Sequence, residues 1–367
     1  MAKLGEVCKL NMGQSPDSSS YNCIGDGIPF FQGNADFGEI HPNIRVWCNA
    51  PTKIAHPGEI LISVRAPIGA MNIADCECCI GRGLASISAD EAVCTTKYLW
   101  YGISSKIEEL NAKGTGSTFK AINKKTLEEA EIPIRDLMEQ ERIAANLDRV
   151  TALISLRKQQ ITKLDELVKA RFVEKSKEWQ AVPGQLNEFL EDITYGFTNP
   201  MPDAEEGPWK VTAKDVVNGH INILTARKTT NEAFERLTNK SKPRKGDVLL
   251  TKDGTLGRVA VVDVENLCVN QSVAVMRCNN KIYPEFLAMI LQMPEYQRKL
   301  LEDSGGGTIK HLYITKVDKM LISVPDLVIQ KDLLMFAKRV EQQKQTVQQS
   351  LEKLALMKKA LMQEYFG

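Results

Sequence analysis

The feature that most constrains this chain is a heptad pattern of apolar residues from about Asp136 to Phe172. The apolar positions recur in alternating steps of four and three, which is the period of a helix packed against another helix. Asp136 and Glu139 have the spacing of a capping box and so predict where the helix begins. A helix of about 38 residues is about 57 Å long, far longer than the mean helix of a globular domain. The fold must therefore accommodate a long rod.

A second rod follows the first at a constant offset, which places Gln140 on Gln330. Its seam, the stripe of apolar heptad residues, runs to the end of the sequence and is interrupted by polar residues such as Lys344. Such residues commonly determine which helix is the partner and in which register the two helices pack. Two surface helices on unrelated domains are the alternative, and the shared offset makes it less favourable. The predicted helix–helix contacts are Ile143, Leu147, Val150, Ile154, Ile161, Leu164 and Val168 in the first rod, and Leu333, Val340, Val347, Leu351, Leu354 and Leu361 in the second.

The composition is that of an ordinary globular protein. A chain of 367 residues with 43% hydrophobic and 25% charged residues suggests two or three domains with substantial cores. The sequence has no long apolar run and no signal-peptide pattern at its N-terminus, so we expect a cytoplasmic protein without a membrane span. A net charge of +1 means that any nucleic-acid binding requires positive charge gathered on one face.

The nine cysteines are predicted to be reduced thiols. Cys76 and Cys79 have C-x-x-C spacing, but no second pair follows, so buried free thiols are favoured over a metal site. The histidines show no ligand spacing. The sequence contains neither an Asn-Pro-Pro-aromatic tetrapeptide nor a phosphate-binding loop. We therefore expect no catalytic residues, no metal and no cofactor.

The segments before each rod also resemble each other. Residues 57–75 align with 245–263, and each reads as strand–turn–strand. The same predicted elements then follow in each half of the chain. With the range in the first half given before that in the second, they are a strand (Ile80 to Ile87, Val269 to Met276), a helix (Tyr98 to Asn111, Pro284 to Asp303), a glycine-rich turn (114–122, 305–312) and a short strand (Ala130 to Ile134, Met320 to Val324). The chain is thus predicted to be α+β, with an internal pseudo-two-fold repeat of a mixed α/β globule followed by a long helix. The sequences of the N-terminal segments of the two globules differ. Different binding specificities and sequence drift after duplication explain this difference equally well.

These segments resemble a known family. PIRDLMEQERIAANLDRV, entering the first rod, is similar to the central conserved region of the specificity subunit of type I restriction–modification systems. GEILISVRAPIGAMNIAD and GDVLLTKDGTLGRVAVVD resemble the body of its target-recognition domains. The resemblance covers essentially the whole chain and its order. QKDLLMFAKRVEQQ departs from it, because the second rod lacks the Glu-Gln-x-x-Ile entry of the first.

The resemblance implies two target-recognition domains, residues 1–135 and 179–325, separated and followed by long helices, residues 136–178 and 326–367. It implies a DNA-reading subunit without catalysis of its own, in which each globule reads one half of a split, asymmetric target. The helices are expected to form an antiparallel coiled coil that fixes the spacing. The implied partners are double-stranded DNA, two DNA adenine methyltransferase subunits and, in some systems, two restriction subunits.

Candidate DNA contacts are polar and basic loop residues, because Arg and Lys bind phosphates while Arg, Asn and Gln can contact bases. In the first globule we select Gln32, Asn34, Arg45, Arg65, Arg82, Ser117, Thr118 and Lys120. In the second we select Lys210, Lys214, Arg227, Lys228, Lys252, Arg258, Thr308 and Lys310. Three alternatives stay open from the residues alone: a coiled-coil scaffold whose globules bind protein, a methylation-only system that has lost its nuclease, and an enzyme with an unrecognised site.

Overall fold

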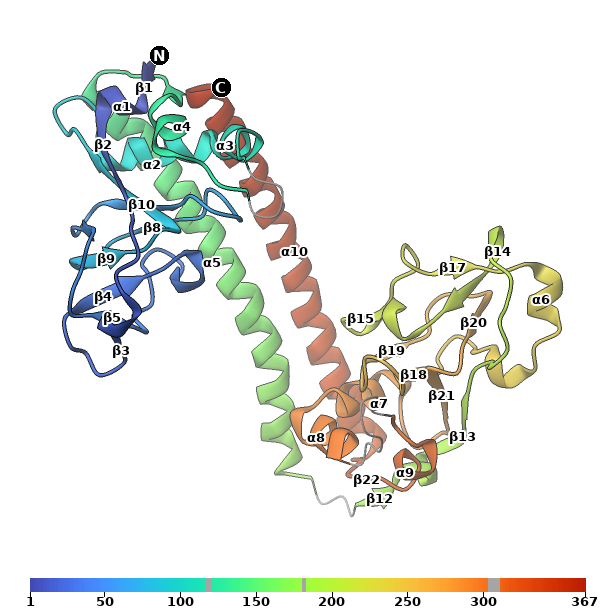
Figure 1. The fold of residues 1–367 in the computed structure, drawn as a ribbon. Coiled ribbons are helices and arrows are strands. Elements are labelled where there is room, and N and C mark those ends of the chain that lie inside the picture. Colours follow the sequence, from blue (N-terminus) through green and yellow to red (C-terminus); the bar gives the residue numbers. More distant parts are fainter. Residues whose placement is uncertain (116–119, 180–182, 303–310) are drawn as a thin grey trace. The chain divides into compact units, whose positions relative to one another are not determined.

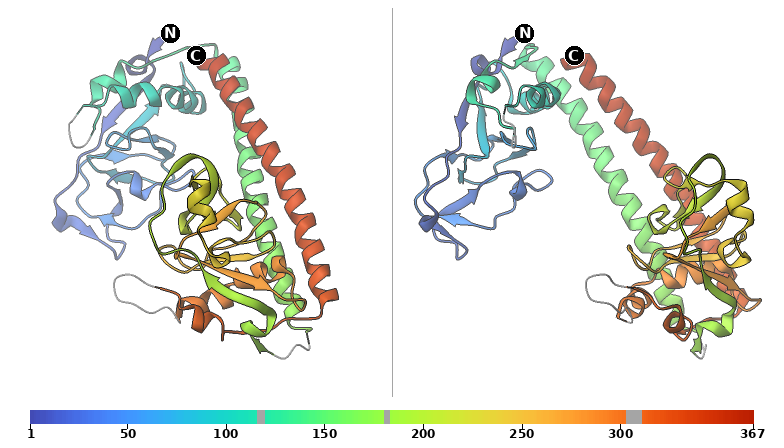
Figure 2. Two further views of the ribbon diagram at one scale, coloured as in Figure 1. Left: turned by 90° about the vertical axis from the view of Figure 1, so that its right-hand side faces the viewer. Right: turned by 45° about the vertical axis from the view of Figure 1, so that its right-hand side comes forward.

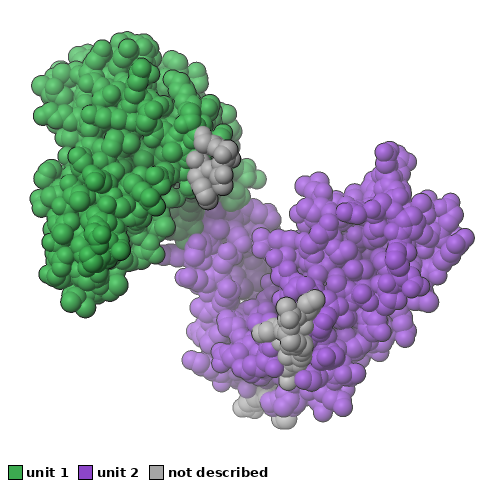
Figure 3. All heavy atoms as spheres, viewed as in Figure 1, with its two compact units in different colours: residues 1–160, 347–367 green, residues 161–346 purple. Residues whose placement is uncertain are grey.

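A computed structural model describes residues 1–115, 120–179, 183–302 and 311–367, which fall into two compact units (Figure 3). Unit 1 comprises residues 1–160 and 347–367, and unit 2 comprises residues 161–346. Two long helices, α5 (Leu137–Ser176) and α10 (Leu327–Phe366), each contribute one part to unit 1 and the other part to unit 2. The remaining elements combine sheets with short helices, which confirms the α+β class (Figure 1).

The central sheet of unit 1 has four antiparallel strands in the order β2-β10-β7-β8. They are β2 (Cys8–Met12), β7 (Ile60–Ser63), β8 (Met71–Ile73) and β10 (Leu84–Ala89). The β7–β8 hairpin confirms the predicted strand–turn–strand, and Gly69 in its turn has φ +93°, a conformation that glycine adopts without strain. The predicted strand from Ile80 to Ile87 is wrong in one respect: it is two strands, β9 (Cys78–Ile80) and β10, separated by a turn that contains Gly81 and Gly83.

Smaller elements complete unit 1. A second sheet has the order β3-β5-β4-β9-β6, and β1 pairs with β11. These strands are β3 (Tyr21–Asn22), β5 (Trp47–Cys48), β4 (Ile28–Phe31), β9 (Cys78–Ile80), β6 (Ile54–Ala55), β1 (Ala2–Lys3) and β11 (Glu131–Ile132). The helices are α1 (Leu4–Val7), α2 (Thr96–Ser105), α3 (Ile107–Ala112) and α4 (Lys124–Glu128). The predicted helix from Tyr98 to Asn111 is therefore two helices that meet at Lys106.

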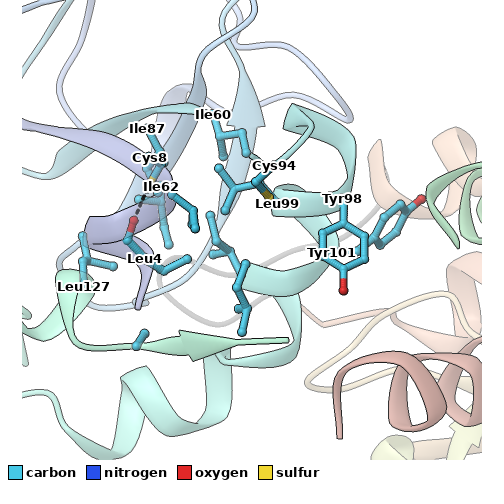
Figure 4. Packing of buried hydrophobic residues seen from close by; sticks show 14 of the residues in the cluster. Leu4, Cys8, Ile60, Ile62, Ile87, Cys94, Tyr98, Leu99, Tyr101 and Leu127 are labelled. Atoms are coloured by element: carbon cyan, nitrogen blue, oxygen red, sulfur yellow. Dashed lines mark hydrogen bonds between the residues drawn. The ribbon is translucent and has the colours of Figure 1, made fainter. Parts of the chain in front are cut away.

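The core of unit 1 joins the central sheet to its helices (Figure 4). Ile60, Ile62 and Leu99 are fully buried there. The last turn of α10 enters the same core, where the Phe366 ring packs 4.9 Å from the ring of Tyr98. Unit 1 is thus built from both ends of the sequence.

Unit 2 has a central sheet of the corresponding order, β13-β21-β18-β19. Its strands are β13 (Leu190–Tyr195), β18 (Val248–Thr251), β19 (Val259–Val261) and β21 (Val273–Cys278). Smaller sheets contain β12 (Gly184–Gln185), β14 (Ala204–Val211), β15 (Val216–Val217), β16 (His220–Ile221), β17 (Arg227–Lys228), β20 (Leu267–Val269) and β22 (Leu321–Ile322). The short helices are α6 (Asn231–Glu235), α7 (Pro284–Leu291), α8 (Pro294–Glu302) and α9 (Ile314–Val317). The predicted helix from Pro284 is divided at Pro294, because proline cannot continue a helix interior.

The rods begin as predicted and continue without a break (Figures 1 and 2). Asp136 Oδ1 accepts the backbone N–H of Glu139 at 2.9 Å, which caps α5. All the predicted seam residues are buried or half-buried, whereas Leu156 and Leu356 on other faces are exposed. Direct contacts join the rods in unit 2, where Lys344 Nζ lies 2.6 Å from Asp165 Oδ1. In the described residues, no helix is long and apolar enough to cross a membrane.

The first turns of each rod are hydrogen-bonded to its globule through one fully buried glutamine. Gln140 Nε2 donates to the carbonyl oxygens of Val93 and Arg135, both at 2.8 Å, and Oε1 accepts the Thr95 N–H at 2.9 Å. Gln330 repeats this arrangement in unit 2, donating to the Lys281 and Pro325 carbonyls and accepting from the Tyr283 N–H. The sequence match between the two glutamines therefore corresponds to the same local structure.

Candidate nucleic-acid interface

One end of the central sheet in unit 1 carries two exposed arginines. The last registered pair of β7 and β10 is Ser63 opposite Leu84, and the Val64 N–H then donates to the Gly83 carbonyl at 2.9 Å. Arg65 follows Val64 and Arg82 precedes Gly83, so the two arginines flank this last hydrogen bond, and both side chains are exposed. The strand pair thus presents two guanidinium groups at the point where it ends.

Gln32 approaches the same end from the neighbouring sheet. Its Nε2 donates to Ser15 Oγ at 2.9 Å, and the backbone N–H of Arg82 donates to the same hydroxyl at 3.2 Å. A Cβ on Gly83 would lie 2.5 Å from the Gln32 carbonyl oxygen, so glycine there permits the close approach. Two of the predicted contacts, Gln32 and Arg82, are therefore joined through one serine.

Asp36 organises the next group. It is buried, accepts the Gln32 N–H at 3.0 Å and accepts the Nε–H of Arg45 at 3.0 Å. Asn34 begins the short 3₁₀ turn that contains Asp36. The Arg45 side chain is 59% exposed, so its guanidinium is oriented by a buried carboxylate while it faces solvent.

Lys120 comes to this end of the sheet through the backbone. Ala121 pairs with Arg65, and the Ala66 N–H donates to the Lys120 carbonyl at 3.0 Å. Lys120 is exposed. Ser117 and Thr118 lie outside the described residues, as do Thr308 and Lys310 in the second glycine-rich turn.

Unit 2 repeats this backbone arrangement with different side chains. The Lys252 N–H donates to the Ser272 carbonyl at 2.8 Å just beyond the β18–β21 pair, and Asp253 pairs with His311. Lys214 lies in the 3₁₀ turn Ala213–Asp215 and is exposed. That turn is fixed to the same place, because the Ala213 N–H donates to Ser272 Oγ at 3.1 Å.

Lys252, Asp253 and His311 form an ionic cluster at this end of the sheet. Lys252 Nζ lies 2.7 Å from Asp253 Oδ2, and His311 Nδ1 lies 2.6 Å from Asp253 Oδ1. Burial raises the pKa of the Asp253 carboxyl, but hydrogen bonds from Lys252 and His311 outweigh it and bring the pKa below its ordinary value. Asp253 is therefore ionised near neutral pH.

The other predicted contacts of unit 2 are not members of this cluster. Lys210 and Arg227 belong to the β14–β17 pair and both form ion pairs with Asp203. Lys228 Nζ lies 4.7 Å from the centre of the Trp209 ring. Arg258 directly precedes β19, and its carbonyl accepts the Thr251 N–H at 2.9 Å beside Lys252, but its Nη1 donates to the Val216 carbonyl at 3.2 Å. The structure does not bring these four residues into the Lys252 cluster.

Sequence reasoning missed the residues that orient the basic groups, namely Ser15, Asp36, Asp253 and His311. The repeat offset contained a usable signal for two of them, because it lays Arg65 near Asp253 and Ala121 on His311. No local motif marks Ser15 or Asp36. Ser15 contacts Arg82, which is distant along the chain, and the contact between Asp36 and Arg45 depends on the conformation of the turn.

The cysteines are free thiols in both units. Burial raises the pKa of the Cys78 thiol to about 12, so this thiol stays protonated near neutral pH. Across residues 1–115, 120–179, 183–302 and 311–367, no group of three or more His, Cys, Asp or Glu residues could hold a metal ion.

Comparison with known proteins identifies the family. The model of the type I restriction modification DNA specificity domain matches residues 1–166 and 201–356. A putative type I restriction enzyme MjaX specificity subunit of Methanocaldococcus jannaschii is 43% identical over 161 residues, covering 44% of this chain and 38% of that relative. The EcoBI specificity subunit of Escherichia coli is 22% identical over 382 residues, covering 92% of this chain and 78% of that relative. This chain thus spans well under half of the first relative and most of the second.

Two solved structures share the fold over nearly the whole chain. The S subunit of a type I restriction–modification system from M. genitalium has a TM-score of 0.55 at 16% identity, covering 100% of this chain and 95% of that one. A chain from a structure of type I R-M complex assembly and conformational transition has a TM-score of 0.63 at 18% identity, covering 99% and 96%. Both of the relatives from M. jannaschii and E. coli are named as specificity subunits of type I restriction enzymes. This chain belongs to the family of type I restriction–modification DNA specificity proteins.

Proposed function

We propose that this protein is the sequence-specific DNA-binding subunit of a type I restriction–modification complex, and that each globule reads one half of a bipartite, asymmetric target. The supporting observation is the pair of polar, basic surfaces at the corresponding end of each central sheet. These are the Gln32–Arg65–Arg82 surface of unit 1 and the Lys214–Lys252–His311 surface of unit 2. The proposed recognition domains are residues 1–135 and 179–325, with helices at 136–178 and 326–367.

We further propose that the long helices form an antiparallel coiled-coil spacer in a pseudo-two-fold repeat. The burial of the seam residues and the Lys344–Asp165 ion pair support helix–helix packing. The repeated glutamine contacts and the matching order of strands support the duplication. Such a frame suits two copies of a DNA adenine methyltransferase subunit, to which two restriction subunits can add. The cytoplasmic location stays a prediction.

The direct test is to express the chain with its methyltransferase partner and to map methylated adenines across the host genome. We expect one split motif with a constant gap. Exchanging residues 1–130 for those of a homologue should change one half of the motif and leave the other half and the gap intact. Methylation that is scattered or absent would contradict the proposal, as would a change in both halves.

A second prediction concerns the unit 1 surface. Replacing Arg65 and Arg82 together with alanine should weaken DNA binding by the methyltransferase complex, and the slope of log K against log salt should fall by about one for each lost phosphate contact. The matched control is Lys125→Ala, because Lys125 is exposed on α4 and pairs with Glu129. Fluorescence anisotropy titrations over a range of KCl concentrations measure both quantities. Equal slopes of log K against log salt for the control and the double variant would show that these arginines do not contact DNA phosphates.

The competing function, a scaffold whose globules bind protein, predicts that the wild-type complex shows no salt-dependent DNA binding. The same titrations therefore separate the two functions before any variant is made.

A further inference from the structure

The Lys252 side chain is held from two directions. Its ammonium lies 2.7 Å from Asp253 Oδ2 and 5.5 Å from the centre of the Tyr195 ring, and only 17% of the side chain is exposed. A free surface lysine samples many rotamers, and ordering one on binding costs free energy. Lys252 is already ordered, and an ammonium has three donors, of which Asp253 uses one.

Asp253 is in turn held by His311. An ionised carboxylate only accepts hydrogen bonds, so His311 Nδ1 must carry the proton that it shares with Asp253 Oδ1 at 2.6 Å. The backbone supports this contact, because Asp253 and His311 pair as a β-bridge and the Leu312 N–H donates to the Lys252 carbonyl at 2.9 Å. The contacts thus run from His311 through Asp253 to Lys252.

Unit 1 has the same backbone bridge but none of these side chains. Arg65 stands at the position of Asp253, Ala121 at that of His311 and Val64 at that of Lys252. Arg65 is exposed and can reach a partner directly. At the equivalent position unit 2 carries a carboxylate, which alone would repel DNA.

We propose that Asp253 and His311 are positioning residues that hold Lys252 as a pre-organised clamp for a phosphate of the DNA backbone. This inference rests on the proposed DNA-binding function. Lys252 supplies the donor to the phosphate, Asp253 orients it, and His311 fixes Asp253. Pre-organisation of this kind makes a contact stronger by reducing the ordering that binding requires.

The sign of the Asp253→Asn effect distinguishes a positioning role from a simple charge effect. Removing a negative charge beside bound DNA strengthens binding if only the summed charge matters. Removing an orienting group instead weakens binding, because Lys252 is released from its place. We expect Asp253→Asn to weaken DNA binding by about threefold and Lys252→Ala by about tenfold, with a salt slope lower by about one in the latter.

The experiment measures affinity by anisotropy for the full chain with its methyltransferase partner, using a duplex that carries the mapped motif, at several KCl concentrations. The variants are Asp253→Asn, Lys252→Ala and the double variant. In the double variant, Asp253→Asn should cause no further loss, because the lysine that it orients is absent. A structural defect alone would weaken binding by the same factor in both backgrounds.

Tighter binding by Asp253→Asn, or equal losses in both backgrounds, would overturn the positioning role. If Asp253→Asn does not fold, His311→Gln carries the same test, because the His311 side chain is 44% exposed; unchanged affinity and slope in that variant would also overturn it. Failure of the proposed function is distinguishable, since the wild-type complex itself would then show no salt-dependent DNA binding.

Discussion

Replacing Gln140 with alanine is expected to lower the free energy of unfolding of unit 1 by about 2–4 kcal/mol. Gln140 is fully buried, and its amide satisfies the Thr95 N–H and two backbone carbonyls where the globule meets α5. Alanine leaves these groups unpaired and creates a cavity, and each effect is costly in a protein interior. Hydrogen exchange of the amides of α2 and of residues 137–160 in α5, measured against denaturant, reports the loss for unit 1 separately, because both segments belong to that unit.

Gln330→Ala is the matched variant, since Gln330 makes the same contacts in unit 2. It should destabilise unit 2 by a similar amount. Gln159→Ala is the control, because Gln159 is exposed on α5 and its loss should change stability by less than about 0.5 kcal/mol. A Gln140→Ala protein as stable as this control would show that the buried amide contributes nothing to the junction.

Lengthening both rods by one heptad should change the gap of the DNA target. Seven residues add about 10.5 Å to a helix, which is about three base pairs at about 3.4 Å each. The added heptads duplicate residues 152–158 in α5 and residues 351–357 in α10, which keeps the apolar seam in phase. Mapping methylated adenines should then show unchanged half-motifs with a longer gap.

Adding the heptad to α5 alone is the informative control. The Lys344–Asp165 pair and the seam residues beyond the insertion would lose their register, so we expect loss of methylation rather than a new gap. An active complex whose gap is unaltered by the paired insertion would refute the spacer role of the rods. The outcome bears on the spacer alone, because the half-motifs depend on the globules.

Long-range features of this fold were predictable because they repeat. The seam, the buried glutamines and the hairpins recur at nearly constant offsets, so weak local signals support one another. Boundaries were less accurate where glycine or proline interrupts an element. Gly81 and Gly83 separate β9 from β10, and Pro294 separates α7 from α8. The period of the apolar residues does not reveal such breaks. The glycines and prolines that cause them are the local signal.

The candidate interface was predictable in its basic residues but not in their supports. Arg65, Arg82 and Gln32 were selected as single exposed polar residues, and only the strand register brings them to one end of the sheet. Lys210 and Arg227 have the same composition signal, yet Asp203 pairs with both of them on another sheet. Charge in a sequence does not reveal which carboxylate will neutralise it, since that depends on tertiary contacts.

The division of the long helices between units has a consequence for synthesis on the ribosome. Unit 2 is one continuous segment, residues 161–346, and all of its core is available once that segment has emerged. Unit 1 needs Phe366 and its neighbours to cover Tyr98, although most of its residues are made first. During translation, unit 1 therefore exposes an apolar face until α10 is complete. In this period the apolar surface that a chaperone can cover is largest.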